Sequence, residues 1–316
     1  MEQIIEPVDR AVLKQELTEE RFLRHTNNGA NLVYLVNFHN APNVLREVGR
    51  LREITFRDAG GGTGLSLDID ENDTCERCYD QLIAWNPVEE EIIAGYRLIR
   101  CDFAGSTETG EHNLSTAHLF DFSETFESEY LPHTIELGRS FVQPKYQPVK
   151  NNRKGLFSLD NLWDGLGAVV ILNPDIQYLF GKVTMYSHYN VEARNALLSF
   201  MHHYFPDESV LVRPIKGLEL KHDPKEYKQM FLGLEYKAGY KVLNTFVRAR
   251  GENIPPLINT YMNLSPTMKT FGTAINNEFG SVEETGILIR IADIYESKKS
   301  RHIDTFERDK YFKQLT

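Results

Sequence analysis

The sequence predicts an α/β fold in which helices cover both faces of a central mixed sheet. Stretches with the apolar spacing of amphipathic helices alternate with short apolar runs that are typical of buried strands. Two of these runs, 80–85 and 92–101, flank the turn residues Asn86-Pro87, a pattern that favours an antiparallel hairpin. The order helix, hairpin, strand, helix, strand, helix, strand is that of a sheet packed between helices.

The first half of the chain supplies two predicted helices and the first strand. Residues 9–24 and 43–56 place apolar side chains at helical spacing, and in the second helix Arg52 and Phe56 share one face. Residues 32–38 are almost continuously apolar, which indicates a buried strand.

In the second half, a polar surface loop and a strand around Glu136 come before alternating helices and strands. These are a loop with some helix at 105–130, a buried helix at 156–172, a strand at 179–187, a helix at 191–204, a strand at 210–214, a charged helical region at 221–253 and a last strand of the same sheet at 285–294. The chain shows no internal repeat, so we divide it into an N-terminal helical segment (1–28), a core (29–220) and a C-terminal extension (221–316) that completes the same domain.

The composition is that of a large globular domain. Of the 316 residues, 41% are hydrophobic and 25% charged, and the net charge of −10 argues against a nucleic-acid binder. No apolar run of about 18 residues predicts a membrane-spanning helix, and the acidic N-terminus is unlike a signal peptide, so we expect a cytoplasmic protein. Cys75 and Cys78 have zinc or redox spacing, but Cys101 is the only other thiol, so we interpret the pair as incidental and predict no metal site.

A carboxylate and a guanidinium, Glu136 and Arg139, stand three residues apart in one predicted strand. Burying both is unfavourable unless each group has a use. Glu136 suits a general base that takes a proton from an attacking amine. The alternative is a buried ion pair with Arg139 or Arg97 that only ties the sheet together.

Arginine and aspartate residues recur around this pair. Arg52, Arg97 and Arg139 either bind a substrate carboxylate through their planar guanidinium groups or form salt bridges with nearby aspartates. For each arginine, both alternatives remain open.

Asp68, Asp70 and Asp73 begin like a calcium-binding loop. However, the sixth position holds Asp73 where glycine is required and the twelfth holds Tyr79 where glutamate is required, so we predict no calcium. These aspartates hold the positive charge of an acceptor amine, pair with Arg52, or form a solvated turn. The preceding glycine-rich stretch, 60–64, lacks the ending of a phosphate-binding loop, and we interpret it as a flexible segment over the site.

Basic residues cluster after the Glu136 strand, with no acid between Gln143 and Leu159. The cluster consists of Lys145, Lys150, Arg153 and Lys154. In an acidic chain, such a patch either attracts an acidic partner or is a solvated loop.

Taken in order along the chain, these residues resemble a motif of the GNAT superfamily of N-acyltransferases. The motif residues are Arg52, Phe56, Asp68, Asp70, Asp73, Arg97, Glu136 and Arg139. The matching branch, often labelled hemolysin-like, holds the ornithine and glycine N-acyltransferases of amino-acid-lipid synthesis, and acyl-homoserine-lactone synthases are more distant relatives. The segments 162–166, 178–181 and 254–280 extend the resemblance over most of the chain.

The chain departs from the family pattern in three places. Gln81-Leu82 stands where many members have His-Leu. No tryptophan lies between Phe56 and Asp68, which counts against lactone synthesis. Only Arg153-Lys154-Gly155 remains of the usual pyrophosphate loop, which counts against ordinary acetyl-CoA binding.

The resemblance implies a GNAT-like central mixed sheet and an acyltransferase core at 29–220. The implied reaction moves a 3-hydroxylated long-chain acyl group from acyl carrier protein to an amino acid amine, with glycine favoured and ornithine next. Glu136 and Arg139 would be catalytic, and backbone N–H groups of the neighbouring strand would hold the oxyanion. Substrate binding would fall to Arg52, Phe56, Asp68, Asp70, Asp73 and Arg97, and carrier-protein docking to Lys145, Lys150, Arg153 and Lys154.

No metal or redox cofactor is implied, because the acyl-phosphopantetheine thioester is itself a substrate. The amphipathic product is compatible with peripheral contact at the inner membrane without any anchor. The alternative functions are a hemolysin-like membrane-active protein, an acyl-CoA-dependent acetyltransferase and an enzyme like the acyl-homoserine-lactone synthases.

Overall fold

The computed structural model describes residues 1–316 except 107–109, 111, 148–156, 219–223, 308–310 and 312–316. The chain forms two compact units. Unit 1 contains Met1–Ser115, Pro132–Gln177 and Glu296–Thr316, and unit 2 contains Thr116–Leu131 and Tyr178–Tyr295. All predicted catalytic and substrate-binding residues belong to unit 1. The sequence-based boundaries at residues 28 and 220 stay a prediction.

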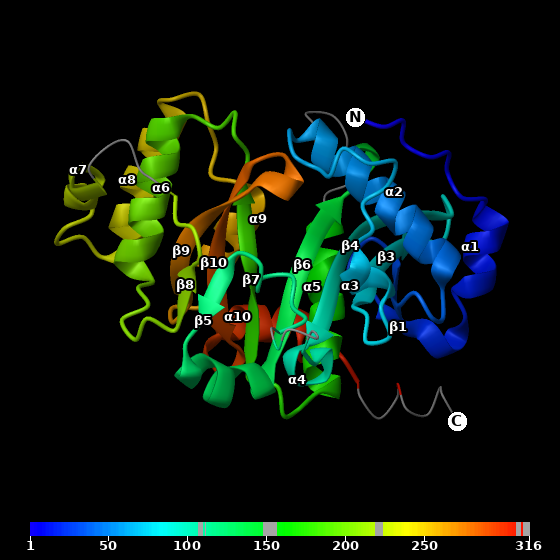
Figure 1. The fold of residues 1–316 in the computed structure, drawn as a ribbon. Coiled ribbons are helices and arrows are strands. Elements are labelled where there is room, and N and C mark those ends of the chain that lie inside the picture. The colour runs from blue at the N-terminus through cyan, green and yellow to red at the C-terminus, as the bar shows by residue number, and fades with distance from the viewer. Residues whose placement is uncertain (107–109, 111, 148–156, 219–223, 308–310, 312–316) are drawn as a thin grey trace. The chain divides into compact units, whose positions relative to one another are not determined.

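The strands of unit 1 pair in antiparallel fashion in the order β1-β2-β3-β4-β6 (Figure 1). Their bounds are Phe22–His25, Leu32–Val36, Asp80–Asn86, Glu91–Arg100 and Thr134–Val142. The predicted strand at 32–38, the predicted hairpin and the Glu136 strand are confirmed as β2, β3 with β4, and β6.

Helices α2 (Pro42–Asp58) and α5 (Ser158–Leu172) cover opposite faces of this sheet. On β3, the side chain of Gln81 accepts a hydrogen bond from Arg52 of α2. The next residue, Leu82, packs so closely against α5 that a Cβ on Gly165 would lie 2.9 Å from its methyl carbons. Because adjacent strand residues point to opposite faces, the predicted α/β fold with helices on both faces is confirmed.

The first helix is shorter than predicted. α1 (Arg10–Glu16) ends where the Glu16 carboxylate accepts hydrogen bonds from the backbone N–H groups of Asn43 and Val44, at 3.2 and 2.8 Å, and so caps the N-terminus of α2. The prediction of helix up to residue 24 is wrong, because residues 22–25 form β1 and pair with β2. This strand pairing overrides the local helical spacing. The described part of unit 1 also contains the short α-helices α3 (Glu71–Thr74), α4 (Cys101–Ala104) and α10 (Glu296–His302).

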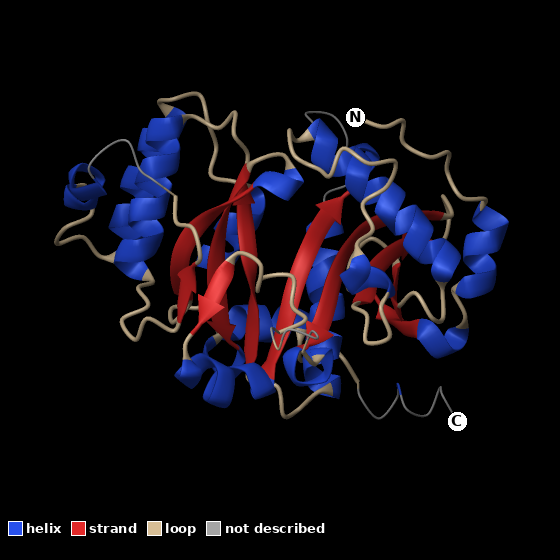
Figure 2. Ribbon diagram, viewed as in Figure 1, coloured by secondary structure: helices blue, strands red, loops and turns tan. Residues whose placement is uncertain are grey.

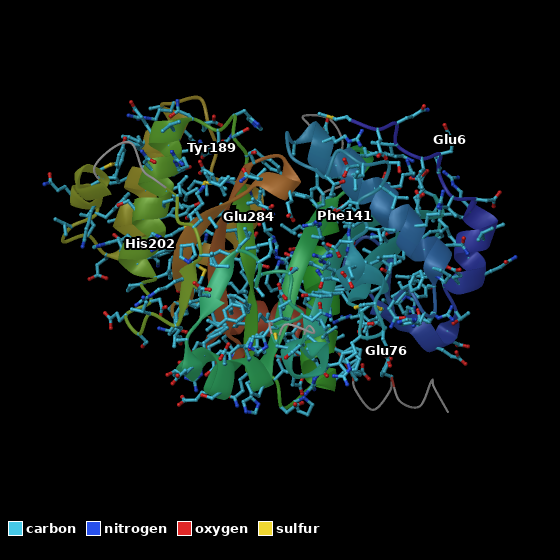
Figure 3. The ribbon with its side chains drawn as sticks, in the orientation of Figure 1. Glu6, Glu76, Phe141, Tyr189, His202 and Glu284 are labelled. Atoms are coloured by element: carbon cyan, nitrogen blue, oxygen red, sulfur yellow. The ribbon has the colours of Figure 1, made fainter. Side chains whose placement is uncertain are left out.

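In unit 2, strands pair in the order β7-β10-β9, and β5 pairs with β8; Figure 2 shows the strands in red and the helices in blue. The strand bounds are Tyr178–Met185 (β7), Val282–Arg290 (β10), Lys269–Asn276 (β9), Phe120–Phe122 (β5) and Val212–Pro214 (β8). The helices are α6 (Val191–Tyr204), α7 (Pro224–Gln229), α8 (Tyr236–Arg248) and α9 (Pro256–Met262). The structure confirms the predicted strands at 179–187, 210–214 and 285–294 and the predicted helix at 191–204. Strand β9 was not predicted from the sequence. Glu284, labelled in Figure 3, forms a buried ion pair with Lys182 at 2.8 Å.

The expectation of a polar surface loop at 105–130 is wrong for much of that segment. Its apolar side chains are buried, including Leu114 in unit 1 and Phe120 and Phe126 in unit 2. The ring of Phe126 lies 5.2 Å from that of Phe180 on β7, so aromatic packing draws the segment into the core. Among the described residues, none of the helices is both long and apolar enough to cross a bilayer.

Candidate active site

The side chain of Arg52 lies fully buried in a cluster of ion pairs. Its Nη1 atom lies 3.0 Å from Oδ2 of Asp73, and its Nη2 atom donates to Oε1 of Gln81. The Nε2 atom of Gln81 in turn donates to Oδ1 of Asp73 at 3.0 Å. Asp73 is therefore bound both by Arg52 of helix α2 and by Gln81 of strand β3.

Arg97 of β4 enters the same cluster. Its Nη1 atom lies 2.8 Å from each carboxylate oxygen of Asp70 and 3.3 Å from Oδ2 of Asp73. Asp70 and Asp73 also form a capping box at the start of α3, in which each side chain accepts a hydrogen bond from the backbone N–H of the other. This turn fixes both carboxylates toward the arginines.

The charges of the cluster depend on one another. Burial alone would raise the pKa of Asp73, but the Arg52 and Arg97 guanidinium groups outweigh it and hold that pKa well below its ordinary value. Burial alone would lower the pKa of Arg97, but the negative charges of Asp73 and Asp70 outweigh this effect and raise the pKa well above its ordinary value. Asp73 and Arg97 therefore each hold the other in its charged form at neutral pH.

Arg139 reaches the cluster through a bulge in β6. The pairing of β4 with β6 shifts between the pairs Gly95–Phe141 and Arg97–Gly138, so β6 carries an extra residue there. Arg139 itself has a φ of 48°, in the left-handed region, and its Nε atom lies 2.8 Å from Oδ2 of Asp68. A bulge of this kind re-aims a side chain, here toward the aspartates.

The structure thus brings together Arg52, Arg97, Arg139, Asp68, Asp70 and Asp73, as the sequence predicts. It shows the salt-bridge alternative for all three arginines, because each contacts at least one of the aspartates. Direct substrate contact by any of them stays a prediction. The described residues contain no group of three or more His, Cys, Asp or Glu side chains placed to hold a metal ion.

Glu136 lies beside this cluster and is fully buried. Its Oε1 atom accepts a hydrogen bond from Ser115 Oγ at 2.8 Å, and its Oε2 atom accepts one from the hydroxyl of Tyr79. The alternative ion pair with Arg97 or Arg139 does not form in the described residues, because aspartates bind both guanidinium groups. Glu136 is therefore a buried carboxylate held by two neutral donors.

Tyr79 connects Glu136 to the cluster. The guanidinium carbon of Arg97 lies 4.9 Å from the centre of the Tyr79 ring. Burial, together with the charge of Glu136, raises the pKa of Tyr79 well above its ordinary value, so its phenol keeps the proton and donates it in a hydrogen bond. The same phenol oxygen accepts the backbone N–H of Ser115 at 2.8 Å.

Two other predicted features have clear structural surroundings. Phe56 is buried in the core of unit 1, 5% exposed, one helical turn after Arg52. The glycine-rich stretch after it is bound to buried Glu53, whose carboxylate accepts the backbone N–H groups of Thr63 and Gly64 at 3.1 and 2.8 Å. Substrate contact by Phe56 and the interpretation of the stretch as a flexible segment over the site both stay predictions.

Of the predicted docking residues, only Lys145 lies within the described part of the chain. Its Nζ atom lies 2.7 Å from a carboxylate oxygen of Glu91 and 3.7 Å from one of Glu89. These acids offset its charge locally, so it contributes less to a basic patch than the sequence suggests. The other three, Lys150, Arg153 and Lys154, lie outside the described residues.

Sequence reasoning missed two residues that bind Glu136, Tyr79 and Ser115. Ser115 lies 21 positions before Glu136, in the segment expected to be a surface loop. Tyr79 attracted notice only as a residue unfit to bind calcium. The sequence indicated only that the buried carboxylate of Glu136 needs hydrogen-bond donors. Nothing in the neighbouring sequence identifies the hydroxyl groups that supply these hydrogen bonds.

Comparison with known proteins identifies the family to which this chain is similar. Residues 51–153 match the acetyltransferase (GNAT) domain family. A glycine N(alpha)-acyltransferase of Bacteroides thetaiotaomicron is 55% identical to this chain, over 97% of this chain and 91% of its own length. A glycine N(alpha)-acyltransferase of Phocaeicola vulgatus is 52% identical, over 97% of this chain and 94% of its own length.

Among solved structures, the AHL synthase LasI is similar over 49% of this chain and 72% of its own, with a TM-score of 0.33 and 15% identity, a likeness too weak to bear on function. The full-length identity to the two glycine N(alpha)-acyltransferases confirms the resemblance that the motif residues indicate. The chain belongs to the glycine N(alpha)-acyltransferase family of GNAT enzymes.

Proposed function

We propose that this protein transfers a 3-hydroxylated long-chain acyl group from acyl carrier protein to the amine of glycine, with Glu136 as general base. The observation that carries the proposal is the state of Glu136, a fully buried carboxylate bound by two hydroxyl groups rather than by a cation. A carboxylate paired with arginine would be a poorer proton acceptor. The two similar relatives named above supply the reaction class.

The reaction needs a base because the amine of an amino acid is mostly protonated at neutral pH. After one proton is lost, the amine nitrogen attacks the thioester carbonyl carbon, and a C–N bond forms as the C–S bond breaks. As the amide forms, the nitrogen loses a second proton, and the phosphopantetheine sulfur leaves as a thiolate and takes up a proton in its place, so that a free thiol is released. Glu136 receives the first ammonium proton, and general-base help of this kind contributes about 10²–10⁴-fold to the rate.

The tetrahedral intermediate carries a negative oxygen that needs donors. The bulge at Arg139 disturbs the regular β4–β6 pairing, and β-bulges are over-represented next to active sites. We assign the oxyanion to backbone N–H groups of the neighbouring strand β4. Preorganised donors of this type stabilise the transition state of acyl transfer.

The acceptor is tested by letting glycine and ornithine compete at equal concentration for one 3-hydroxyacyl carrier protein donor. We expect N-acylglycine to dominate, because Asp68, Asp70 and Asp73 are already paired with arginines. A side-chain ammonium of ornithine would then lack an acidic partner in this cluster. Mass spectrometry of the products decides the outcome. Predominant acyl-ornithine would refute the choice of glycine and leave the acyltransferase reaction standing.

The identity of the acyl donor is tested by a charge-reversal variant in which Lys150, Arg153 and Lys154 are all replaced by glutamate. We expect a higher apparent KM for acyl carrier protein, and a wild-type KM that rises with salt, because the carrier protein is acidic. Acyl-pantetheine serves as the control donor, since it lacks the carrier's charged surface. If this short donor suffers equally in the triple variant, the basic residues do not dock the carrier protein.

A further inference from the structure

Helix α8 of unit 2 has one side that packs into the protein. Its buried residues, Gly239, Leu243 and Val247, recur every four positions and therefore line one side of the helix. This side meets α6, because the ring of Phe200 on α6 lies 5.6 Å from that of Tyr236 on α8. Figure 1 shows the two helices side by side. The opposite side of α8 is exposed to solvent.

The solvent side of α8 carries two parallel rows of exposed residues. The basic row has spacings of four and seven residues, which keep its members on one face, and consists of Lys237, Lys241 and Arg248. The apolar row lies one position further along the chain, has the same spacings, and consists of Ala238, Val242 and Ala249. No Asp or Glu occurs between residues 236 and 251, although the chain as a whole has a net charge of −10.

The charges of the basic row take no part in ion pairs within the described part of the chain. Arg250, a fourth basic residue of α8's C-terminal end, is different: it pairs with Glu192 of α6, and its guanidinium carbon lies 3.3 Å from the centre of the Phe246 ring. A structural role thus accounts for Arg250 and not for Lys237, Lys241 or Arg248. Three uncompensated positive charges in line, on an acidic protein, attract an anionic surface outside it.

A planar anionic surface fits the geometry of this helix. α8 spans 13 residues, or about 20 Å, so the basic row lies along a straight edge. The small side chains of Ala238 and Ala249 let that edge approach a surface closely, while the flexible lysine stems carry their charges to phosphate oxygens. Val242, 36% exposed, adds an apolar contact at a lipid interface.

We propose that the solvent side of α8 binds the anionic surface of a lipid bilayer through Lys237, Lys241 and Arg248. Phosphate groups of anionic lipids accept hydrogen bonds from the three cations, and the apolar row contacts the boundary between headgroups and acyl chains. The binding is peripheral and reversible, because three charges and a few small apolar groups do not anchor a protein. The inference rests on the proposed function in one respect, since a long-chain N-acylglycine is an amphiphile that leaves the enzyme for a bilayer.

The first test measures binding of the full chain to sedimented vesicles of phosphatidylcholine, with and without phosphatidylglycerol. We expect the wild type to bind only the anionic vesicles, and the binding to weaken as salt screens the charges. A variant in which Lys237, Lys241 and Arg248 are all replaced by glutamine should bind about 100-fold less tightly, because each basic side chain near an anionic surface contributes roughly fivefold. Glutamine is a good helix former, and circular dichroism checks that the variant is folded.

The matched control removes three exposed basic side chains from other elements, so that its net charge equals that of the α8 variant. The control replaces with glutamine Arg46 on α2, Arg213 on β8 and Lys216, which follows β8. We expect this control to bind anionic vesicles as the wild type does. An equal loss of binding in both triple variants would reduce the effect to net charge and overturn the α8 site, as would unchanged binding of the α8 variant.

The second test places a fluorescent side chain on the proposed surface. In Val242→Trp, the emission should shift to shorter wavelength when anionic vesicles are added, because an indole that enters the interface leaves water. The natural tryptophans, Trp85 and Trp163, are buried in unit 1 and supply a constant background. Val88→Trp is the control, since Val88 is 87% exposed in the turn between β3 and β4. Vesicle binding without a shift at position 242, or with an equal shift at position 88, would overturn the site.

An acidic protein is the rival partner, and the proposed function supplies one, acyl carrier protein. If the α8 variant binds vesicles like the wild type but has a raised KM for acyl carrier protein, the basic row docks the carrier and the lipid proposal falls. We expect instead that the variant keeps wild-type turnover and KM with soluble substrates, because α8 holds none of the residues assigned to the reaction. An enzyme that forms no N-acylglycine would refute the proposed function, whereas vesicle binding is measured without substrate and still decides the role of α8.

Discussion

Replacing Glu136 with glutamine is expected to lower acyl transfer to glycine by about 10²–10⁴-fold at pH 7 while the fold survives. Glutamine keeps the shape of the side chain and can still accept a hydrogen bond from Ser115 or Tyr79, but it cannot take up a proton. Steady-state turnover with acyl carrier protein as donor measures the loss. The deficit should shrink at high pH, where the glycine amine no longer needs a base.

The control for this variant is Glu53→Gln, which alters another fully buried glutamate of unit 1. Glu53 binds Arg57 and the glycine-rich stretch, so its replacement tests the general effect of removing a buried carboxylate. We expect Glu53→Gln to lower the free energy of unfolding while leaving the turnover of the folded enzyme close to that of the wild type. Near-normal turnover of Glu136→Gln at pH 7 would remove Glu136 from the role of general base.

Replacing Asp73 with asparagine is expected to destabilise unit 1 by about 3–5 kcal/mol. Asp73 is fully buried and contacts both Arg52 and Arg97, so the substitution leaves two buried guanidinium groups with too little negative charge. Chemical denaturation followed by tryptophan fluorescence measures the free energy of unfolding. The fluorescence reports on unit 1, because both tryptophans of the chain, Trp85 and Trp163, lie buried there.

The same aspartate predicts how stability changes with pH. Its folded pKa lies well below the unfolded value of about 3.9, because the arginines outweigh the effect of burial. A depressed carboxyl pKa stabilises the folded state above the unfolded pKa, and this stability is lost as the pH falls toward the folded pKa. We therefore expect stability to decline below about pH 5 and to decline less steeply in Asp73→Asn.

Asp58→Asn provides the comparison, since Asp58 is an exposed aspartate at the end of α2 in the same unit. Its replacement should change stability by no more than about 0.5 kcal/mol. A similarly small effect for Asp73→Asn would mean that the ion-pair cluster does not hold unit 1 together.

Local patterns were sufficient for most elements of this fold. The apolar spacing of residues 43–56 predicts a helix, and α2 spans Pro42–Asp58. The continuous apolar runs identified β2, β7 and β10 because a buried strand needs little else. β1 and β9 were not predicted from the sequence. These strands form by pairing with β2 and β10, respectively, and local residue patterns do not reveal such pairing.

The sequence by itself determined the family motif, the carboxylate of Glu136 that we propose as the base, and the set of charges around it. Only the tertiary structure decided which charge binds which, because Asp68 and Arg139 lie 71 positions apart and meet through a bulge in β6. It also decided that hydroxyls of Tyr79 and Ser115, rather than an arginine, hold Glu136. The physical reason is that a buried polar group must find its partner in space, and spacing along the chain does not record that choice.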